Sequence, residues 1–308
     1  MNRLPTRCRI DLPDRLEDDG LSARVGRLIA RSELPKPSHD GGAPLWDASQ
    51  FGLAASLLFK ELGGDAQWEL LSTCSRKLLE ESYFIERAGM SFAPKMALLA
   101  ESVEEQMLYC LFSSQEACHY SMIAAWANPV AARPMEDPFL SLLAQSINTC
   151  SRRQLVFLVQ VVLEGWGLHH YRSLESQCRN ASLREVFRHI LRDEVQHHGS
   201  GLDLFREERL SSQEISGLVE LMMEFLSLVR SGPVGVMSAL EASAGGLTSR
   251  QRALAFEELG HPGKTREKLA LLRSLMEAAG ARRILEALDA AKAFSCRALE
   301  ECHPSIER

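Results

Sequence analysis

From Asp47 onward, apolar residues recur at steps of three and four, which is the repeat of one face of an α-helix. No convincing run alternates apolar and polar residues over the length of a strand next to a hairpin turn of the Asn-Gly type. A chain with this pattern buries its apolar residues between helices, so the sequence predicts an all-α fold. Its 308 residues are enough to enclose a full hydrophobic core.

Turn-forming residues are concentrated at the start of the chain, where Pro5, Pro13, Pro35 and Pro37 precede a Gly-Gly pair. We therefore expect residues 1–45 to form an irregular N-terminal arm with one short helix over 22–31. Residues 46–210 are predicted to form the main helical bundle. No low-complexity linker follows, so residues 211–308 are expected to add further helices that pack on the bundle within one compact unit.

Local signals place the ends of these helices. Gly63-Gly64, Gly89 and Asn180 are typical stop signals, and a serine followed three residues later by a glutamate is typical of a helix start. The start signal occurs at Ser102 and at Ser211. On these grounds the sequence predicts helices over residues 48–62, 66–88, 94 or 102 to 127, 138–149, 152–177, 182–208, 211–230, 249–259, 265–279 and 281–301.

The charge of the chain argues against two classes of partner. A net charge of −6 and a pI near 5.9 give no basic field, so we expect no binding to nucleic acid or to an anionic membrane. The first residues carry charges and prolines where a signal peptide needs an apolar stretch, and the eight cysteines form no Cys-x-x-Cys pair. We expect a cytoplasmic protein with reduced thiols.

Two Glu-x-x-His motifs carry the chemistry, Glu116 to His119 and Glu194 to His197, and each lies within a predicted helix. A three-residue step on an α-helix is a rotation of about 300° and a rise of about 4.5 Å. Both side chains of each motif therefore leave the same helix face one turn apart, where they can bind one metal ion.

A further glutamate precedes each motif. Glu81 lies 35 residues before Glu116, and Glu164 lies 30 residues before Glu194. A pair of antiparallel helices with a turn between them brings such positions level with each other. Two such helix pairs would supply four carboxylates and two neutral imidazoles. Two divalent cations would neutralise their total charge of −4. Glu80 and Glu86 compete with Glu81 as the ligand, and His198 competes with His197.

This order of residues, Glu, Glu-x-x-His, Glu, Glu-x-x-His, resembles that of the ferritin-like non-haem di-iron carboxylate proteins, and most of all the p-aminobenzoate N-oxygenase type. The resemblance covers residues 66 to 208. It implies a ferritin-like four-helix bundle and an aspartate, Asp193, that orients the ligand His119 through its other ring nitrogen. It also implies two iron ions, with manganese or a mixed pair suiting the same ligands, held by Glu81, Glu116, His119, Glu164, Glu194 and His197.

The same resemblance implies an O₂-dependent oxygenase or oxidase that acts on a small organic substrate, such as an amine or another biosynthetic intermediate. It further implies a separate electron donor, a reductase or a ferredoxin, and we also expect a homodimer. Four residues are predicted to line the substrate pocket: Phe84, Phe112, Val161 and Trp166. Two alternatives stay open, a ferroxidase that handles iron itself and a metal-free helical scaffold.

Overall fold

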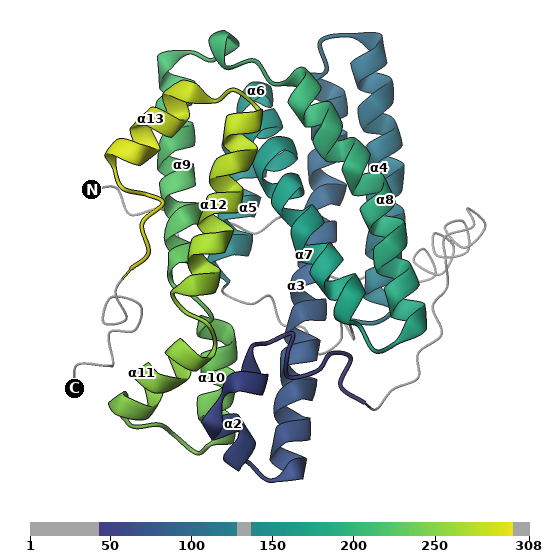
Figure 1. Ribbon diagram of the computed structural model, residues 1–308. Helices are drawn as coiled ribbons and strands as arrows, with labels where there is room; N and C mark the ends of the chain where they lie inside the picture. Colours follow the sequence, from purple (N-terminus) through teal and green to yellow (C-terminus); the bar gives the residue numbers. More distant parts are fainter. Residues whose placement is uncertain (1–42, 128–136, 298–308) are drawn as a thin grey trace. The chain divides into compact units, whose positions relative to one another are not determined.

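The computed structural model describes residues 43–127 and 137–297, and within these residues it is built of helices with no strand (Figure 1). The predicted all-α fold is confirmed. Residues 1–42, which carry most of the predicted arm and its helix over 22–31, lie outside the described residues, as do 128–136 and 298–308. No helix in the described part of the chain is long and apolar enough to cross a membrane.

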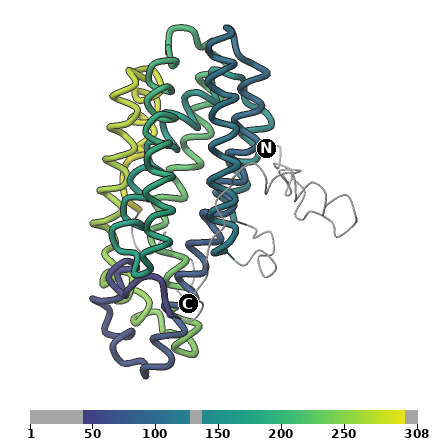
Figure 2. Tube along the Cα trace, turned by 90° about the vertical axis from the view of Figure 1, so that its right-hand side faces the viewer, coloured from purple at the N-terminus to yellow at the C-terminus, as the bar shows by residue number. Residues whose placement is uncertain are grey.

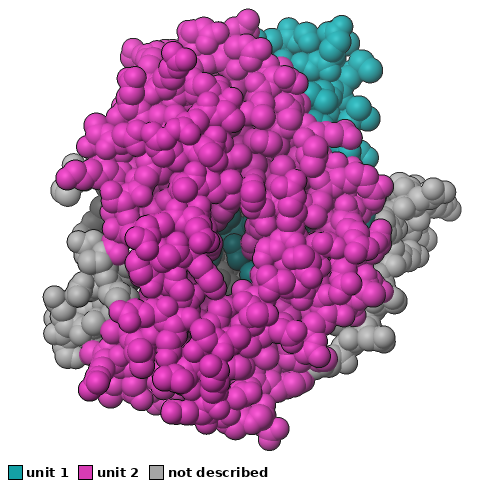
Figure 3. All heavy atoms as spheres, in the orientation of Figure 1, with its two compact units in different colours: residues 1–41, 78–152 teal, residues 42–77, 153–308 magenta. Residues whose placement is uncertain are grey.

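The described residues form two compact units, which Figure 3 distinguishes by colour. Unit 1 contains residues 78–127 and 137–152, and unit 2 contains residues 43–77 and 153–297. The helices that follow residue 210 therefore belong to the same unit as residues 153–210. The predicted boundaries at residues 45 and 210 stay predictions.

Unit 1 consists of the second part of α3 (Gly64–Leu99), α4 (Val103–Ala124) and α5 (Pro138–Thr149). Figures 1 and 2 show α3 and α4 side by side. Ser102 caps α4, since its hydroxyl oxygen accepts a hydrogen bond of 3.1 Å from the backbone N–H of Glu105. Of the two predicted starts for this helix, the one at Ser102 is confirmed.

The predicted end of α3 at Ala88 is wrong, because the helix continues through Gly89 and Pro94 to Leu99. Gly89 acts here as a packing residue. A Cβ atom at Gly89 would lie 2.0 Å from Oε2 of Glu116, so a glycine is what lets the Glu116 side chain lie against the backbone of α3.

Unit 2 holds the remaining helices. The predicted helix over 48–62 is reduced to a short 3₁₀ turn, η1, and α2. The stretch between residues 230 and 249, for which no helix was predicted, contains α10. The elements are η1 (Leu53–Ala55), α2 (Leu57–Glu61), η2 (Val156–Leu163), α7 (Glu164–Gln177), α8 (Ala181–Leu204), η3 (Glu207–Arg209), α9 (Ser212–Arg230), α10 (Val234–Ser243), α11 (Ser249–Glu258), α12 (Gly263–Ala278) and α13 (Arg282–Ala290), with the one-turn α6 (Arg152–Leu155) at the boundary between the units.

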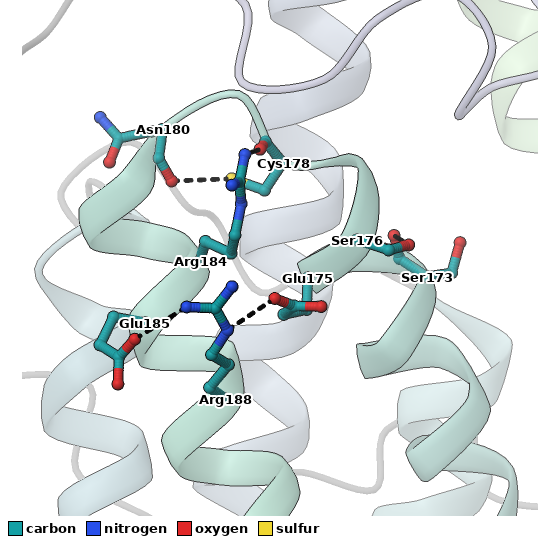
Figure 4. Close-up of polar contacts among 8 residues, drawn as sticks. All are labelled: Ser173, Glu175, Ser176, Cys178, Asn180, Arg184, Glu185 and Arg188. Carbon is teal, nitrogen blue, oxygen red and sulfur yellow. Dashed lines mark hydrogen bonds and ion pairs between the residues drawn. The ribbon is translucent and has the colours of Figure 1, made fainter.

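Helices α7 and α8 form an antiparallel hairpin, and polar contacts close its turn (Figure 4). The side chain of Asn180 caps α8 by accepting a hydrogen bond of 3.0 Å from the Leu183 N–H. Arg188 on α8 donates to the carboxylate of Glu175 on α7 at 2.8 Å (Figure 4). The turn therefore fixes which positions of α7 and α8 lie level with each other.

The later helices of unit 2 are joined to its core by buried polar contacts as well as by apolar packing. The capping box predicted at Ser211 and Glu214 is confirmed at the start of α9. Helices α12 and α13 pack on α9. One carboxylate oxygen of the buried Glu207 accepts hydrogen bonds from the first backbone N–H groups of α13, those of Arg283 at 2.9 Å and Ile284 at 3.2 Å.

Candidate metal centre

Unit 1 pairs a carboxylate of α3 with an imidazole of α4. Oε2 of Glu86 lies 3.4 Å from Nδ1 of His119, and the exposed fractions of the two side chains are 2% and 0%. Buried charge of this kind is costly unless a cation or a hydrogen-bonding group compensates it. This contact selects Glu86, one of the two alternatives to Glu81, as the carboxylate that faces His119.

Glu116 adds a second carboxylate from α4. It lies one turn before His119 and is buried. The carboxylate of Glu116 lies against the backbone of α3 at Gly89, which is one turn after Glu86. We define Glu86, Glu116 and His119 as the unit 1 half-site, because His119 faces Glu86 and Glu116 faces Gly89, one turn further along α3.

Unit 2 brings together the equivalent three groups from α7 and α8. Nδ1 of His197 lies 3.4 Å from Oε2 of Glu164 and 3.4 Å from Oε2 of Glu194. The hairpin accounts for this meeting, since Glu164 lies 14 residues before Cys178 and Glu194 lies 14 residues after Asn180. We define Glu164, Glu194 and His197 as the unit 2 half-site.

The electrostatics of the unit 2 half-site favour a cation. Burial raises the pKa of Glu164 well above its usual range, and the negative charge of Glu194 raises it further, while His197 acts in the opposite direction. In the metal-free protein this carboxylate is therefore driven to take up a proton. A metal cation at the same position would replace that proton and allow both carboxylates to stay ionised.

The residues present fit a first-row metal ion. Oε2 of Glu164 is buried and accepts no hydrogen bond within the described residues, although it contacts the His197 ring. The same ring nitrogen, Nδ1, faces Glu86 in the unit 1 half-site and both carboxylates in the unit 2 half-site. Carboxylate and imidazole ligands together suit iron, manganese or zinc better than calcium or magnesium, which prefer oxygen ligands alone.

The contacts of Glu86 reveal a symmetry that the sequence analysis missed. Glu86 lies 30 residues before Glu116, and Glu164 lies 30 residues before Glu194. Both upstream glutamates also begin a Glu-x-x-Gly sequence, which ends at Gly89 in α3 and at Gly167 in α7. An equal spacing was the available signal for Glu86. Glu81 is half-buried in α3, and its role as a ligand stays a prediction.

Within unit 2 the structure separates the two neighbouring histidines. His197 faces the two carboxylates, whereas Nδ1 of His198 lies 2.9 Å from the backbone carbonyl oxygen of Gln160. Asp193 lies one turn after His189, with Oδ2 3.7 Å from Nε2 of that ring. The orienting role of Asp193 toward His119 stays a prediction.

Three of the four predicted pocket residues make aromatic contacts with a residue of their own unit, and the fourth is fully buried. In unit 1, Phe84 has an edge-on ring contact with Tyr83 at 5.2 Å, and the buried Phe112 has one with Tyr109 at 5.9 Å. In unit 2, Val161 is fully buried, and the Trp166 ring lies edge-on to Phe225 at 5.0 Å. Their role in lining a substrate pocket stays a prediction.

A separate hollow in unit 2 has a different character. It has a volume of about 420 Å³, lies where α9 begins, and is lined by serine, glutamine and glutamate side chains of that region together with Gln154. None of the four predicted pocket residues lines it.

Comparison with known proteins found no family model, no curated protein and no solved structure that matches this chain.

Proposed function

We propose that this protein is an O₂-dependent oxidoreductase with a dinuclear non-haem metal centre of iron, acting on a small organic substrate. The observation that supports the proposal is the unit 2 half-site, in which two carboxylates, only 11% and 9% exposed, each lie 3.4 Å from one imidazole nitrogen. Unit 1 contains a half-site of the same composition, Glu86, Glu116 and His119. Each half-site offers a charge of −2, which one divalent cation balances, so the two half-sites account for two metal ions.

Iron, when bound, supplies the electrons and the binding position for O₂ that no side chain provides. The protein's own groups prepare that position. Glu164 exchanges the proton favoured by its raised pKa for the cation, and His197 directs Nδ1 toward the same point. The fully buried Val161 and the buried Phe112 keep water away from their respective half-sites.

The resemblance to the p-aminobenzoate N-oxygenase type supports an amine as the first substrate class to test. The proposal also includes an external reductase or ferredoxin, because each turnover of an oxygenase needs electrons that the chain does not store. A homodimer and a cytoplasmic location remain part of the proposal and rest on the sequence alone.

Reaction with labelled O₂ tests the proposal. The protein is loaded with ferrous iron without oxygen and mixed with a chemical reductant, a panel of small aromatic amines and isotopically labelled O₂, and the products are analysed by mass spectrometry. We expect a product that carries the label with the wild type and at least a hundredfold less of it with Glu194→Ala, because one carboxylate of the unit 2 half-site is gone. Glu185→Ala is the matched control, since this residue lies exposed on the same helix.

The other outcomes separate the alternatives. Oxidation of the iron without labelled product from any amine would favour the ferroxidase hypothesis. Consumption of no O₂ by the iron-loaded wild type would contradict the oxidoreductase and favour the metal-free scaffold.

A further inference from the structure

A π-helical stretch, η2, ends immediately before Glu164. The backbone N–H of Glu164 donates to the carbonyl oxygen of Val159, five residues back, whereas in an α-helix it would donate to that of Gln160, four residues back. One residue corresponds to about 100° of rotation around a helix. The π-helical turn therefore sets the direction in which the Glu164 side chain leaves its helix.

The carbonyl oxygen of Gln160 has another partner, on α8. Nδ1 of His198 lies 2.9 Å from it, and because a carbonyl can only accept, Nδ1 is the donor. In a regular α-helix the Glu164 N–H would donate to the Gln160 carbonyl oxygen. Here that oxygen accepts from His198 instead. The histidine that follows the metal-facing His197 therefore contacts the turn that orients Glu164.

Neighbouring residues accommodate the contact between His198 and Gln160. A Cβ atom at Gly165 would lie 2.8 Å from Cε1 and 3.0 Å from Nδ1 of His198, and 2.8 Å from Cδ2 of Leu275, so a glycine is what leaves room for both side chains. The side-chain amide of the fully buried Gln160 donates to the His197 carbonyl oxygen at 3.3 Å and to the Ser200 hydroxyl at 3.1 Å. These two hydrogen bonds join η2 to α8 at residues on either side of His198.

We propose that His198 is a positioning residue, which keeps the π-helical turn in place through its Nδ1–H bond and so directs the Glu164 carboxylate toward His197. The inference deepens the proposed function and rests on it for the metal that Glu164 would bind. Without this bond, Gln160 O can pair with the Glu164 N–H, and the Glu164 carboxylate turns away from His197.

Two substitutions distinguish the Nδ1–H bond from the rest of the ring. In His198→Asn, the amide nitrogen can donate from nearly the position of Nδ1, whereas His198→Leu keeps the bulk and removes the donor. We expect His198→Leu to weaken the binding of Co²⁺, followed by its visible absorption in an oxygen-free titration of the full chain, by about 10- to 100-fold. His198→Asn should bind Co²⁺ within about threefold of the wild type.

A matched glycine pair tests the same contact from α7. Gly165→Ala should displace the His198 ring and weaken Co²⁺ binding about tenfold, in the range seen for residues that orient metal ligands. Gly167→Ala, on the same helix, should leave Co²⁺ binding unchanged, because a Cβ atom there would have no neighbour within 4 Å among the described residues.

Hydrogen exchange of the metal-free protein gives a readout that does not depend on metal. Protection of the backbone amides over residues 160–166 should fall about tenfold in His198→Leu and stay at the wild-type level in His198→Asn. Unchanged protection in His198→Leu would overturn the inference, and equal losses of Co²⁺ binding in both variants would assign the effect to the ring itself. A wild type that binds no metal would contradict the proposed function, while the exchange comparison would still decide whether His198 holds the turn.

Discussion

Replacing Gly201 by alanine is expected to lower the free energy of unfolding of the metal-free protein by about 2–3 kcal/mol, the scale of overpacking in a filled core. A Cβ atom at Gly201 would lie 2.5 Å from Cβ and 3.0 Å from the backbone carbonyl carbon of Gln160. The backbone of η2 or α8 must therefore move, which outweighs the gain in helix propensity of about 1 kcal/mol that alanine brings. Urea unfolding measures the change.

The matched control is Gly199→Ala, two residues earlier on the same helix. A Cβ atom at Gly199 has no neighbour within 4 Å in the described part of the chain, so this variant should be more stable by about 0.5–1 kcal/mol. Two variants of equal stability would contradict the close approach of α8 to η2.

Replacing Glu164 by glutamine is expected to stabilise the metal-free protein at pH 8 by about 1–3 kcal/mol, the scale of a poorly compensated buried polar group. The pKa of Glu164 is raised in the folded protein, so the folded state binds a proton that the unfolded state releases. Stability of the metal-free wild type should therefore fall as the pH rises from the ordinary pKa of 4.5 toward the raised value. Glutamine carries no charge and removes this dependence.

Urea unfolding of the metal-free protein between pH 5 and pH 8 measures whether the stability of the wild type falls as the pH rises. Glu185→Gln, an exposed position on α8 that is paired with Arg188, should keep the wild-type slope and change the free energy of unfolding by less than about 0.5 kcal/mol. A Glu164→Gln variant with the wild-type pH dependence would show that the carboxylate carries no penalty in the folded protein. With iron present the wild type should instead be more stable than Glu164→Gln, because only the wild type gains stability by binding the metal.

Local signals in the sequence predicted those features of the fold that depend only on neighbouring residues. The caps at Ser102 and Ser211 start α4 and α9 as predicted, since a serine oxygen there accepts a bond from the N–H three residues later. Asn180, predicted only as a stop signal, in fact caps the start of α8. The two Glu-x-x-His motifs lie on helices as predicted, because their spacing depends only on helix geometry.

Features that depend on tertiary contacts were not predictable in this way. Gly89 is a stop signal in the sequence, but in the structure it makes room for Glu116, a residue from another helix. The contact of Glu86 with His119 depends on which face of α3 meets α4, and only the equal spacing of 30 residues hinted at it. The apolar run that forms η2 gives no sign of its π-helical hydrogen bonds, because His198, which contacts Gln160 within this run, lies 38 residues further along the chain.

Metal content per chain tests the central claim most directly. The full chain is loaded with ferrous iron without oxygen, freed of excess iron, and analysed by mass spectrometry beside Glu116→Ala, Glu194→Ala and the control Glu185→Ala. We predict about two iron ions per chain in the wild type and in the control, and loss of bound iron in the other two variants, since each removes a carboxylate from one half-site. A wild type that retains no iron, or half-site variants that retain as much iron as the control, would contradict the account.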